Sequence, residues 1–162
     1  MEILWKLILT KIKMMRKIIK LETDKLFTNL TPQVEAFAKE WGGSGLVNIF
    51  SRHTTCAMWL TEDEILHHTD VRFFLDSMVP KYKDPEGDQK NIKYLHDIIS
   101  LRQDVPPEER INGHSHIRHL FFNSSETIPV ADGKLLLGEW KQLFAVELDP
   151  IRKRELIVTF VG

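Results

Sequence analysis

Residues 31–53, TPQVEAFAKEWGGSGLVNIFSRH, contain a helix and a strand in direct succession. A Thr-Pro pair begins the helix, because a threonine hydroxyl caps free backbone N–H groups and proline is preset for the first turn. Two glycines, at positions 42 and 43, end it. The apolar side chains between them recur at i, i+3, i+4 and i+7, which predicts a helix packed on a core: Val34, Phe37, Ala38 and Trp41.

The strand that follows begins at Gly45. Because side chains alternate between the two faces of a strand, Val47, Ile49, Ser51 and His53 share one face, apolar at first and polar at its end. We therefore expect His53 at the exit of a strand.

The remainder of the chain extends this α+β pattern. The sequence TEDE at 61–64 resembles a capping box and precedes a second helical stripe that stops before Pro80, with a break expected near Thr69. That stripe consists of Val71, Phe74, Leu75 and Met78. Strands are expected at 4–22, 117–122, 126–130, 134–137, 140–148 and 155–161, with a tight turn at Asp132-Gly133.

These elements predict a single compact α+β domain with a largely antiparallel β-sheet or sandwich and two main helices. Residues 17–162 form this domain, and residues 1–16 are an N-terminal extension or an extra strand. The segments 80–91 and 102–113 are rich in proline, glycine and charge, and we expect these loops to fold over a site.

Charge and composition exclude several functions. Lys and Arg number 22 against 23 Asp and Glu, a formal charge of −1, so neither nucleic acid nor a membrane is an expected partner. The single cysteine, Cys56, lies in an apolar run and predicts a buried thiol in a reducing compartment. Residues 3–9 are interrupted by Lys6 and have no basic segment before them, so we expect an untargeted cytoplasmic protein.

Four of the seven histidines, His53, His96, His114 and His116, stand beside small or hydroxylated residues. Neutral imidazole binds zinc and similar ions, and a catalytic site commonly has three protein ligands. If residues 114–116 are in a strand, both of their imidazoles lie on one face and can approach one ion. The alternative is that these histidines hydrogen-bond loop backbones or lie on the surface, the role we favour for His67, His68 and His119.

Four further residues have two interpretations each. Thr54 and Thr55 can donate to a phosphate or carboxylate, or can close a loop by local hydrogen bonds. Glu62 and Asp70, which flank the start of the second helix, can act as base or ligand, or can favour the helix dipole. Motifs of nucleotide-binding folds, serine hydrolases and His-Glu-x-x-His metalloproteases are absent from the sequence.

Several short motifs, in order from about Lys17 to Gly162, resemble the YjbQ family, which is also labelled secondary thiamine-phosphate synthase. The motifs are His53-Thr54-Thr55, Tyr94-x-His96-Asp97, Asn112-Gly113-His114-Ser115-His116-Ile117-Arg118, Ile128-Pro129-Val130, Gly133-x-Leu135-x-Leu137-Gly138-x-Trp140 and Glu147-x-Asp149.

This resemblance implies a homotrimer and a site at which the histidine motifs converge. It implies a divalent metal, of zinc or manganese type with magnesium as the alternative, bound by His53, His96 and His116. Catalytic roles then fall to His114, Glu62, Asp97 and Arg118, and substrate contacts to Thr54, Thr55, Ser115 and Asp70.

The function expected from this set is a metal-dependent small-molecule enzyme. The resemblance implies thiamine-phosphate synthase activity, which joins a pyrimidine diphosphate to a thiazole phosphate with loss of pyrophosphate. Two alternatives stay open: a metal-dependent hydrolase of phosphoester-type bonds, and a non-catalytic trimeric metabolite-binding protein. In each case the expected partner is a small, phosphorylated molecule.

Overall fold

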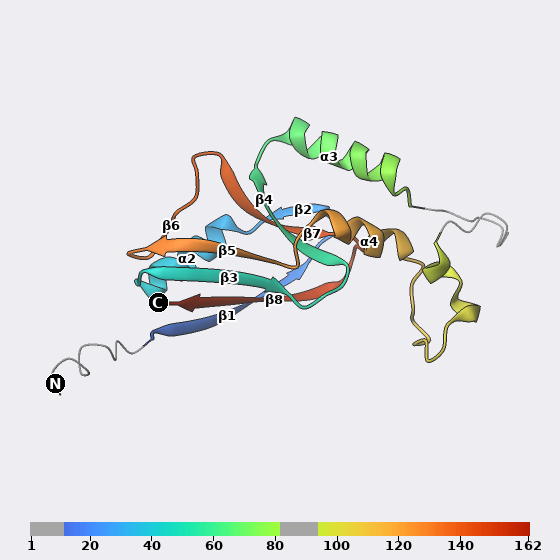
Figure 1. Cartoon of the computed structure of the whole chain (residues 1–162), viewed down its shortest axis with the longest axis horizontal. Coiled ribbons are helices and arrows are strands. Elements are labelled where there is room, and N and C mark those ends of the chain that lie inside the picture. The colour runs from blue at the N-terminus through green and yellow to red at the C-terminus, as the bar shows by residue number, and fades with distance from the viewer. Residues whose placement is uncertain (1–11, 82–93) are drawn as a thin grey trace, which may run out of the picture.

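Two antiparallel sheets form the framework of residues 12–81 and 94–162, the part of the chain that the computed structural model describes (Figure 1). The larger sheet has the order β1 (Met14–Glu22), β8 (Lys153–Val161), β3 (Gly45–Ser51), β5 (Ser125–Ala131), β6 (Lys134–Leu135). The smaller has the order β2 (Phe27–Asn29), β7 (Lys141–Glu147), β4 (Cys56–Glu62). The helices are α2 (Thr31–Trp41), α3 (Ile65–Met78) and α4 (Gly113–Arg118), with short 3-10 turns η2 (Leu95–Asp97), η3 (Ile99–Leu101) and η4 (His119–Phe121). The predicted α+β domain with a largely antiparallel sheet is confirmed.

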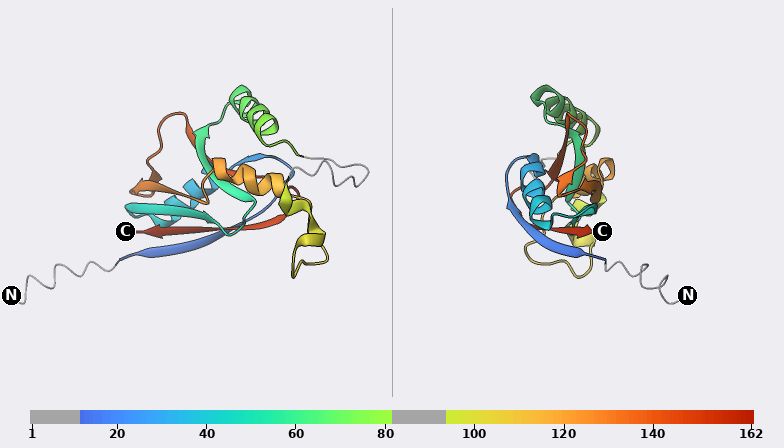
Figure 2. Two further views of the ribbon diagram at one scale, coloured as in Figure 1. Left: turned by 45° about the vertical axis from the view of Figure 1, so that its right-hand side comes forward. Right: turned by 90° about the vertical axis from the view of Figure 1, so that its left-hand side faces the viewer.

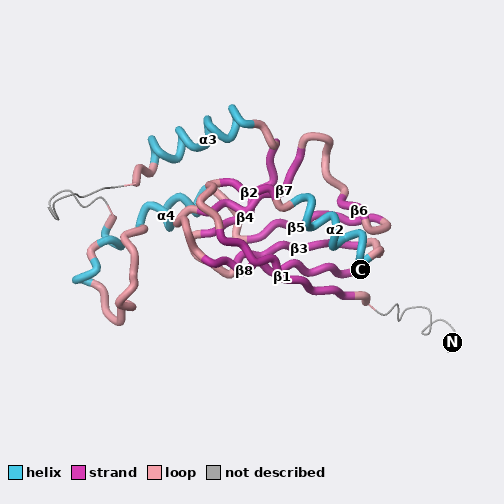
Figure 3. Tube along the Cα trace, turned by 180° about the vertical axis from the view of Figure 1, so that it is seen from behind, coloured by secondary structure: helices cyan, strands magenta, loops and turns pink. Residues whose placement is uncertain are grey.

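The core is shared by both sheets and α2, which lies against one face of the larger sheet (Figure 3). Val34 and Ala38 of α2 are fully buried, and so are Val47 and Ile49 of β3, as the two periodicities predict. At Gly42 the helix ends in the left-handed region, with φ of 64°, a conformation that glycine adopts without a Cβ penalty. The segment 31–53 therefore folds as its sequence predicts.

The second helix begins later in the sequence than predicted and is more exposed. Its cap is Glu64, whose carboxylate accepts the backbone N–H groups of Leu66 and His67, so the predicted capping box is wrong in register. The break expected near Thr69 is also absent, because the Thr69 hydroxyl donates to the Ile65 carbonyl within a continuous α3. Of the predicted stripe only Leu75 is buried, since α3 projects to one side of the sheets (Figure 2).

Residues 117–122 were expected to form a strand and instead form the end of α4 and the turn η4. A helix forms here because it buries His114, Ser115 and Arg118 together on one side of α4. Backbone N–H groups of Ser115 and His116 donate to the Asn112 carbonyl, which begins the helix. The strand predicted at 117–122 is therefore wrong, and the two imidazoles of residues 114–116 do not share the face of a strand.

At the N-terminus, β1 begins at Met14 and pairs with β8 along its full length, so residues 14–16 belong to the larger sheet. Residues 1–11 of the predicted extension lie outside the described residues, as do residues 82–91 of the first predicted loop. The Asp132-Gly133 turn is confirmed between β5 and β6, with φ of 49° and 73°. None of the helices within residues 12–81 and 94–162 has the length and apolar character needed to cross a bilayer.

Candidate functional site

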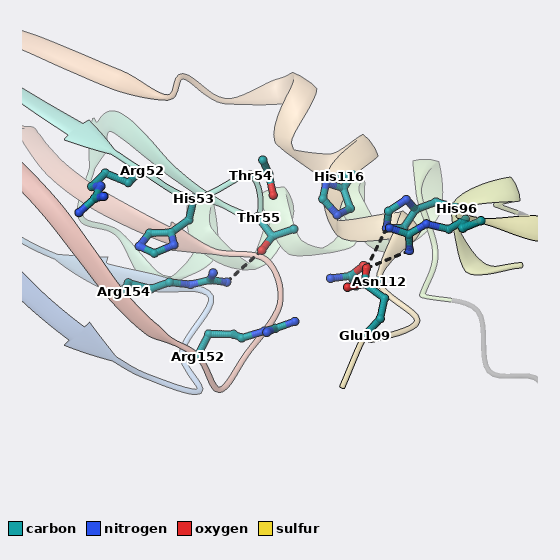
Figure 4. A pocket seen from close by; sticks show the side chains of 11 residues that line it. Arg52, His53, Thr54, Thr55, His96, Glu109, Asn112, His116, Arg152 and Arg154 are labelled. Atoms are coloured by element: carbon teal, nitrogen blue, oxygen red, sulfur yellow. Dashed lines mark hydrogen bonds and ion pairs between the residues drawn. The ribbon is translucent and has the colours of Figure 1, made fainter. Parts of the chain in front are cut away.

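A pocket of about 330 Å³ lies where the end of β3 and the start of β8 meet the segment that leads into α4 (Figure 4). One wall comes from the β3–β4 connection and β8, and the other from residues 96–116. The lining residues are Arg52, His53, Thr54, Thr55, Arg152 and Arg154 on the first wall, and His96, Arg102, Glu109, Asn112 and His116 on the second.

Arg154 is the most firmly held cation of the lining. Its Nε donates to Glu147 Oε2 at 2.6 Å, and its Nη2 donates to Glu147 Oε1 at 2.5 Å and to the Thr55 hydroxyl at 3.0 Å. Both partners of this ion pair are buried, at 6% and 0% side-chain exposure. Burial alone would lower the pKa of Arg154, but the hydrogen bonds and charge of Glu147 raise it above its usual value. The guanidinium is thus a permanent, oriented charge.

The other three arginines of the lining also have carboxylate partners. Arg52 contacts Glu155 at 3.3 Å, Arg152 contacts Asp149 at 3.1 Å, and Arg102 contacts Glu109 at 2.9 Å. Of the carboxylates that hold the four guanidinium groups, only that of Glu109 belongs to the lining. Each contact fixes one edge of a guanidinium, which has five N–H donors, so donors remain for a ligand. The lining therefore presents oriented positive charge.

The three histidines of the pocket differ in their surroundings. His53 Nε2 accepts the Glu155 backbone N–H at 2.9 Å, and burial together with the charge of Arg154 lowers the pKa of His53. On the opposite wall the rings of His96 and His116 lie 4.5 Å apart between centroids. Burial, and then the proximity of His96, lowers the pKa of His116. His53 and His116 are thus neutral at pH 7.

Two polar atoms of the second wall are buried and have no hydrogen-bond partner among the described residues. They are Asn112 Oδ1 and His96 Nε2. The Asn112 amide nitrogen donates to Asp149 Oδ2 at 3.0 Å, which fixes the orientation of the amide, while His96 Nε2 is 3.7 Å from Glu109 Oε1. Buried polar groups normally have partners, so these two atoms are exceptions within the second wall.

The predicted three-histidine metal centre does not assemble in this geometry. His53 stands on one wall, whereas His96 and His116 lie together on the other (Figure 4). In residues 12–81 and 94–162, no three His, Cys, Asp or Glu side chains are placed to hold one ion. The predicted ligand set does not fit a metal ion here, and dependence on a divalent metal stays a prediction.

Thr54 and Thr55 line the pocket as predicted, but four predicted residues lie around α4 and outside the lining. Asp97 accepts the Gly113 N–H at 2.7 Å and so fixes the start of α4. Ser115 donates its hydroxyl to the Leu148 carbonyl. Arg118 donates to the Val79 carbonyl and pairs with Asp76 at 2.7 Å. His114 is buried, and burial together with the charge of Arg118 lowers its pKa to about 4. Their observed contacts position α4.

Glu62 and Asp70 are also outside the lining, and both are exposed. Glu62 is the last residue of β4 and pairs in register with Lys141, while Asp70 lies on α3. The structure therefore does not bring either carboxylate to the histidines.

Sequence reasoning missed six lining residues: Arg52, Arg102, Glu109, Asn112, Arg152 and Arg154. Three of the four arginines lie at strand ends: Arg52 directly follows β3, Arg152 directly precedes β8, and Arg154 is the second residue of β8. Their positions next to the His-Thr-Thr and Glu-x-Asp motifs were the available signal. Residues 102, 109 and 112 come from the 102–113 loop that was predicted to fold over a site, and they line this pocket.

The matches to known proteins agree with the motifs. The family model described as "UPF0047 protein YjbQ-like" matches residues 17–162. The chain belongs to the YjbQ family. A UPF0047 protein of Methanothermobacter thermautotrophicus is 31% identical over 119 residues, which is 74% of this chain and 70% of that protein. Another of Methanocaldococcus jannaschii is 29% identical and covers 93% of this chain and 96% of its own length.

Two solved structures have the same fold. A YjbQ-like protein of unknown function from Sulfolobus solfataricus has a TM-score of 0.75 at 25% identity, covering 93% of this chain and 99% of that one. A hypothetical protein from Aeropyrum pernix has a TM-score of 0.71 at 24% identity, covering 91% and 98%. This likeness shows the fold and assigns no activity.

Proposed function

We propose that the pocket binds a small phosphate-bearing metabolite and that the protein is an enzyme acting on it. The observation that supports this most directly is the lining: four guanidinium groups and one carboxylate face a volume of about 330 Å³. Guanidinium matches phosphate oxygens in pairs, and charge-assisted bonds of this kind are the strong ones. Because the carboxylates of Glu147, Asp149 and Glu155 already hold three of the arginines, binding needs little reorganisation.

The volume supports a small ligand. Ligand pockets commonly span about 300–1,000 Å³, so this one is at the lower end of that range. A nucleic acid or a long chain does not fit such a space, whereas small phosphorylated metabolites do.

Among reactions of such molecules, the proposal favours the transfer implied by the YjbQ resemblance, in which a pyrimidine diphosphate and a thiazole phosphate join and release pyrophosphate. Arg52, Arg152 and Arg154 would stabilise charge on the departing oxygens, since fixed donors act most strongly where charge develops. The metal of the initial prediction is kept as a hypothesis, and no part of this proposal depends on it.

One observation favours a second reaction, hydrolysis of a phosphoester-type bond. His116 lines the pocket, is neutral at pH 7 because its pKa is lowered, and can accept a proton from a water molecule. The two reactions differ in their products, since transfer releases pyrophosphate from two substrates and hydrolysis releases phosphate from one.

The binding experiment is isothermal titration calorimetry of the full chain with pyrophosphate. Arg152→Gln should weaken affinity by about tenfold to a hundredfold, the range expected for losing a charged hydrogen bond. Arg16→Gln is the matched control, because Arg16 is exposed on β1 and outside the lining. Equal affinities for pyrophosphate in the wild type, Arg152→Gln and Arg16→Gln would refute the assignment of the pocket.

Activity is then tested by phosphorus NMR with the pyrimidine diphosphate and thiazole phosphate together, and with each alone. Pyrophosphate that appears only with both substrates supports the transfer, and phosphate from one substrate supports hydrolysis. Binding without either product would favour the non-catalytic metabolite-binding alternative.

The homotrimer implied by the resemblance is also part of the proposal. Large apolar side chains of α3, including Ile65 and Phe73, are exposed in the single chain at 74% and 66%. Exposed apolar groups of this size commonly mark interaction surfaces. Sedimentation equilibrium should give three times the chain mass, and a monomer mass at micromolar concentration would contradict it.

A further inference from the structure

We infer that His53 is a fixed N–H donor to the anionic group of the ligand, held in one neutral tautomer by the backbone of Glu155, and is neither a base nor a metal ligand. The inference that His53 contacts an anion rests on the proposed function. The inference about the tautomer stands on the geometry of the chain alone.

The tautomer follows from the hydrogen bond at Nε2. A backbone N–H can only donate, and that of Glu155 lies 2.9 Å from His53 Nε2. Nε2 must therefore present its lone pair, and the proton of a neutral imidazole must be on Nδ1.

The position of Glu155 explains why an imidazole is needed there. Pairing between β3 and β8 ends with Ser51 opposite Leu156, so Glu155 lies one residue beyond the last β3 partner. His53, two residues after that end, supplies the acceptor that the β3 backbone no longer provides. Glu155 also directly follows Arg154, whose buried bonds to Glu147 fix the start of β8.

The surroundings of His53 also favour the neutral form of its ring. Burial lowers the pKa of His53 most, Arg154 and Arg52 lower it further, and Glu147 only partly offsets the two arginines. Protonation of Nε2 would also place its hydrogen against the Glu155 N–H. Both effects keep the ring neutral at pH 7.

Two roles are then excluded and one is left. A base or a metal ligand acting through Nε2 would have to displace the Glu155 N–H. Nδ1 carries the hydrogen and makes no hydrogen bond to another described residue, and His53 lines the pocket beside Arg52 and Arg154. Nδ1–H is the group that His53 offers to a phosphate oxygen, next to guanidinium donors of the same sign.

The direct test is long-range proton–nitrogen NMR at pH 7 on the full chain with ¹⁵N-labelled histidine. The His53 signals are assigned by their loss in His53→Asn. We expect a protonated Nδ1 and an unprotonated Nε2. A protonated Nε2, or an equal mixture of tautomers, would overturn the inference, and so would stoichiometric Zn²⁺ that shifts the His53 nitrogens as a bound ligand does.

Two matched variants test the donor role by calorimetry with pyrophosphate. Asparagine places an amide N–H near the position of Nδ1, whereas glutamine places its amide near Nε2, so His53→Asn keeps the donor and His53→Gln keeps the acceptor. We expect His53→Asn to bind within about threefold of the wild type and His53→Gln about tenfold more weakly. The reverse order, or full affinity in His53→Gln, would overturn the donor role, with circular dichroism confirming that both variants fold.

These outcomes separate the two proposals. If the wild type does not bind pyrophosphate, the proposed function fails and the donor role fails with it, while the NMR result still decides the tautomer. If the wild type binds and His53→Gln binds equally well, only the inference about His53 fails.

Discussion

Replacing Glu147 with glutamine removes the carboxylate that neutralises the buried guanidinium of Arg154. The pair makes bonds of 2.6 and 2.5 Å, and its side chains are 0% and 6% exposed. Breaking a buried ion pair by removing one charge costs about 3–5 kcal/mol, because the other charge stays buried without compensation. Arg154 borders the pocket and glutamine still accepts one hydrogen bond, so we expect the lower end, about 3 kcal/mol.

The assay is thermal and urea unfolding at one protein concentration and pH 7. For a chain of this length each kcal/mol corresponds to about 2–4 °C, so Glu147→Gln should lower the midpoint by about 6–12 °C. Glu155→Gln is the matched control, because the Glu155 carboxylate contacts Arg52 at 3.3 Å with both side chains about half exposed. An exposed pair contributes at most about 1 kcal/mol.

A double variant, Glu147→Leu with Arg154→Met, sharpens the test. Apolar residues of similar volume can replace a buried ion pair at little cost in stability, so the double variant should be more stable than Glu147→Gln. If Glu147→Gln unfolds within about 2 °C of the wild type, the Glu147–Arg154 pair does not hold β8 in the way described.

Three further predictions concern the buried surroundings of the pocket. The pKa of His114 is lowered to about 4 in the folded protein, so the unfolded chain binds more protons than the folded one between about pH 6.5 and pH 4. As the pH falls through this window, His114 should therefore lower the free energy of unfolding by up to about 3 kcal/mol. His114→Gln should lessen the fall in the urea midpoint between pH 7 and pH 5. At Gly113 an added Cβ would lie 2.7 Å from the Tyr94 Cβ and 2.9 Å from an Asp97 oxygen, so Gly113→Ala should lower stability by about 1–3 kcal/mol in urea unfolding, and an unchanged midpoint would contradict this packing. Burial raises the pKa of the Cys56 thiol to about 11, so a thiol reagent at pH 7 should label it only after unfolding, and rapid labelling of the folded protein would contradict its burial.

The parts of the fold that sequence predicts well are those with strong local patterns. The helix at 31–41 and the strand from Gly45 carry clear periods, and both formed as expected. Residues 117–122 were predicted to form a strand, but a short apolar run that starts at Ile117 is compatible with a helix as well as with a strand. Burial of His114, Ser115 and Arg118 on one side, which depends on distant parts of the chain, decides for helix.

The candidate site also has one part that the sequence predicts and another that it does not. The sequence marks His53, Thr54 and Thr55 and the second-wall histidines as unusual, and they do line one pocket. It does not reveal that Arg154 reaches the same space, because the Glu147 pair that orients Arg154 depends on the contact of β7 with the start of β8. It also does not reveal that His53 and the other histidines occupy opposite walls, since separations along the chain carry no information on side-chain direction.

The central claim is that the arginine-lined pocket binds phosphate groups, and calorimetric titration of the full chain with pyrophosphate tests it most directly. We predict saturable binding at one site per chain that weakens by about tenfold or more in Arg152→Gln and is unchanged in Arg16→Gln. An absence of binding heat in the wild type, or equal affinity in Arg152→Gln, would contradict the claim.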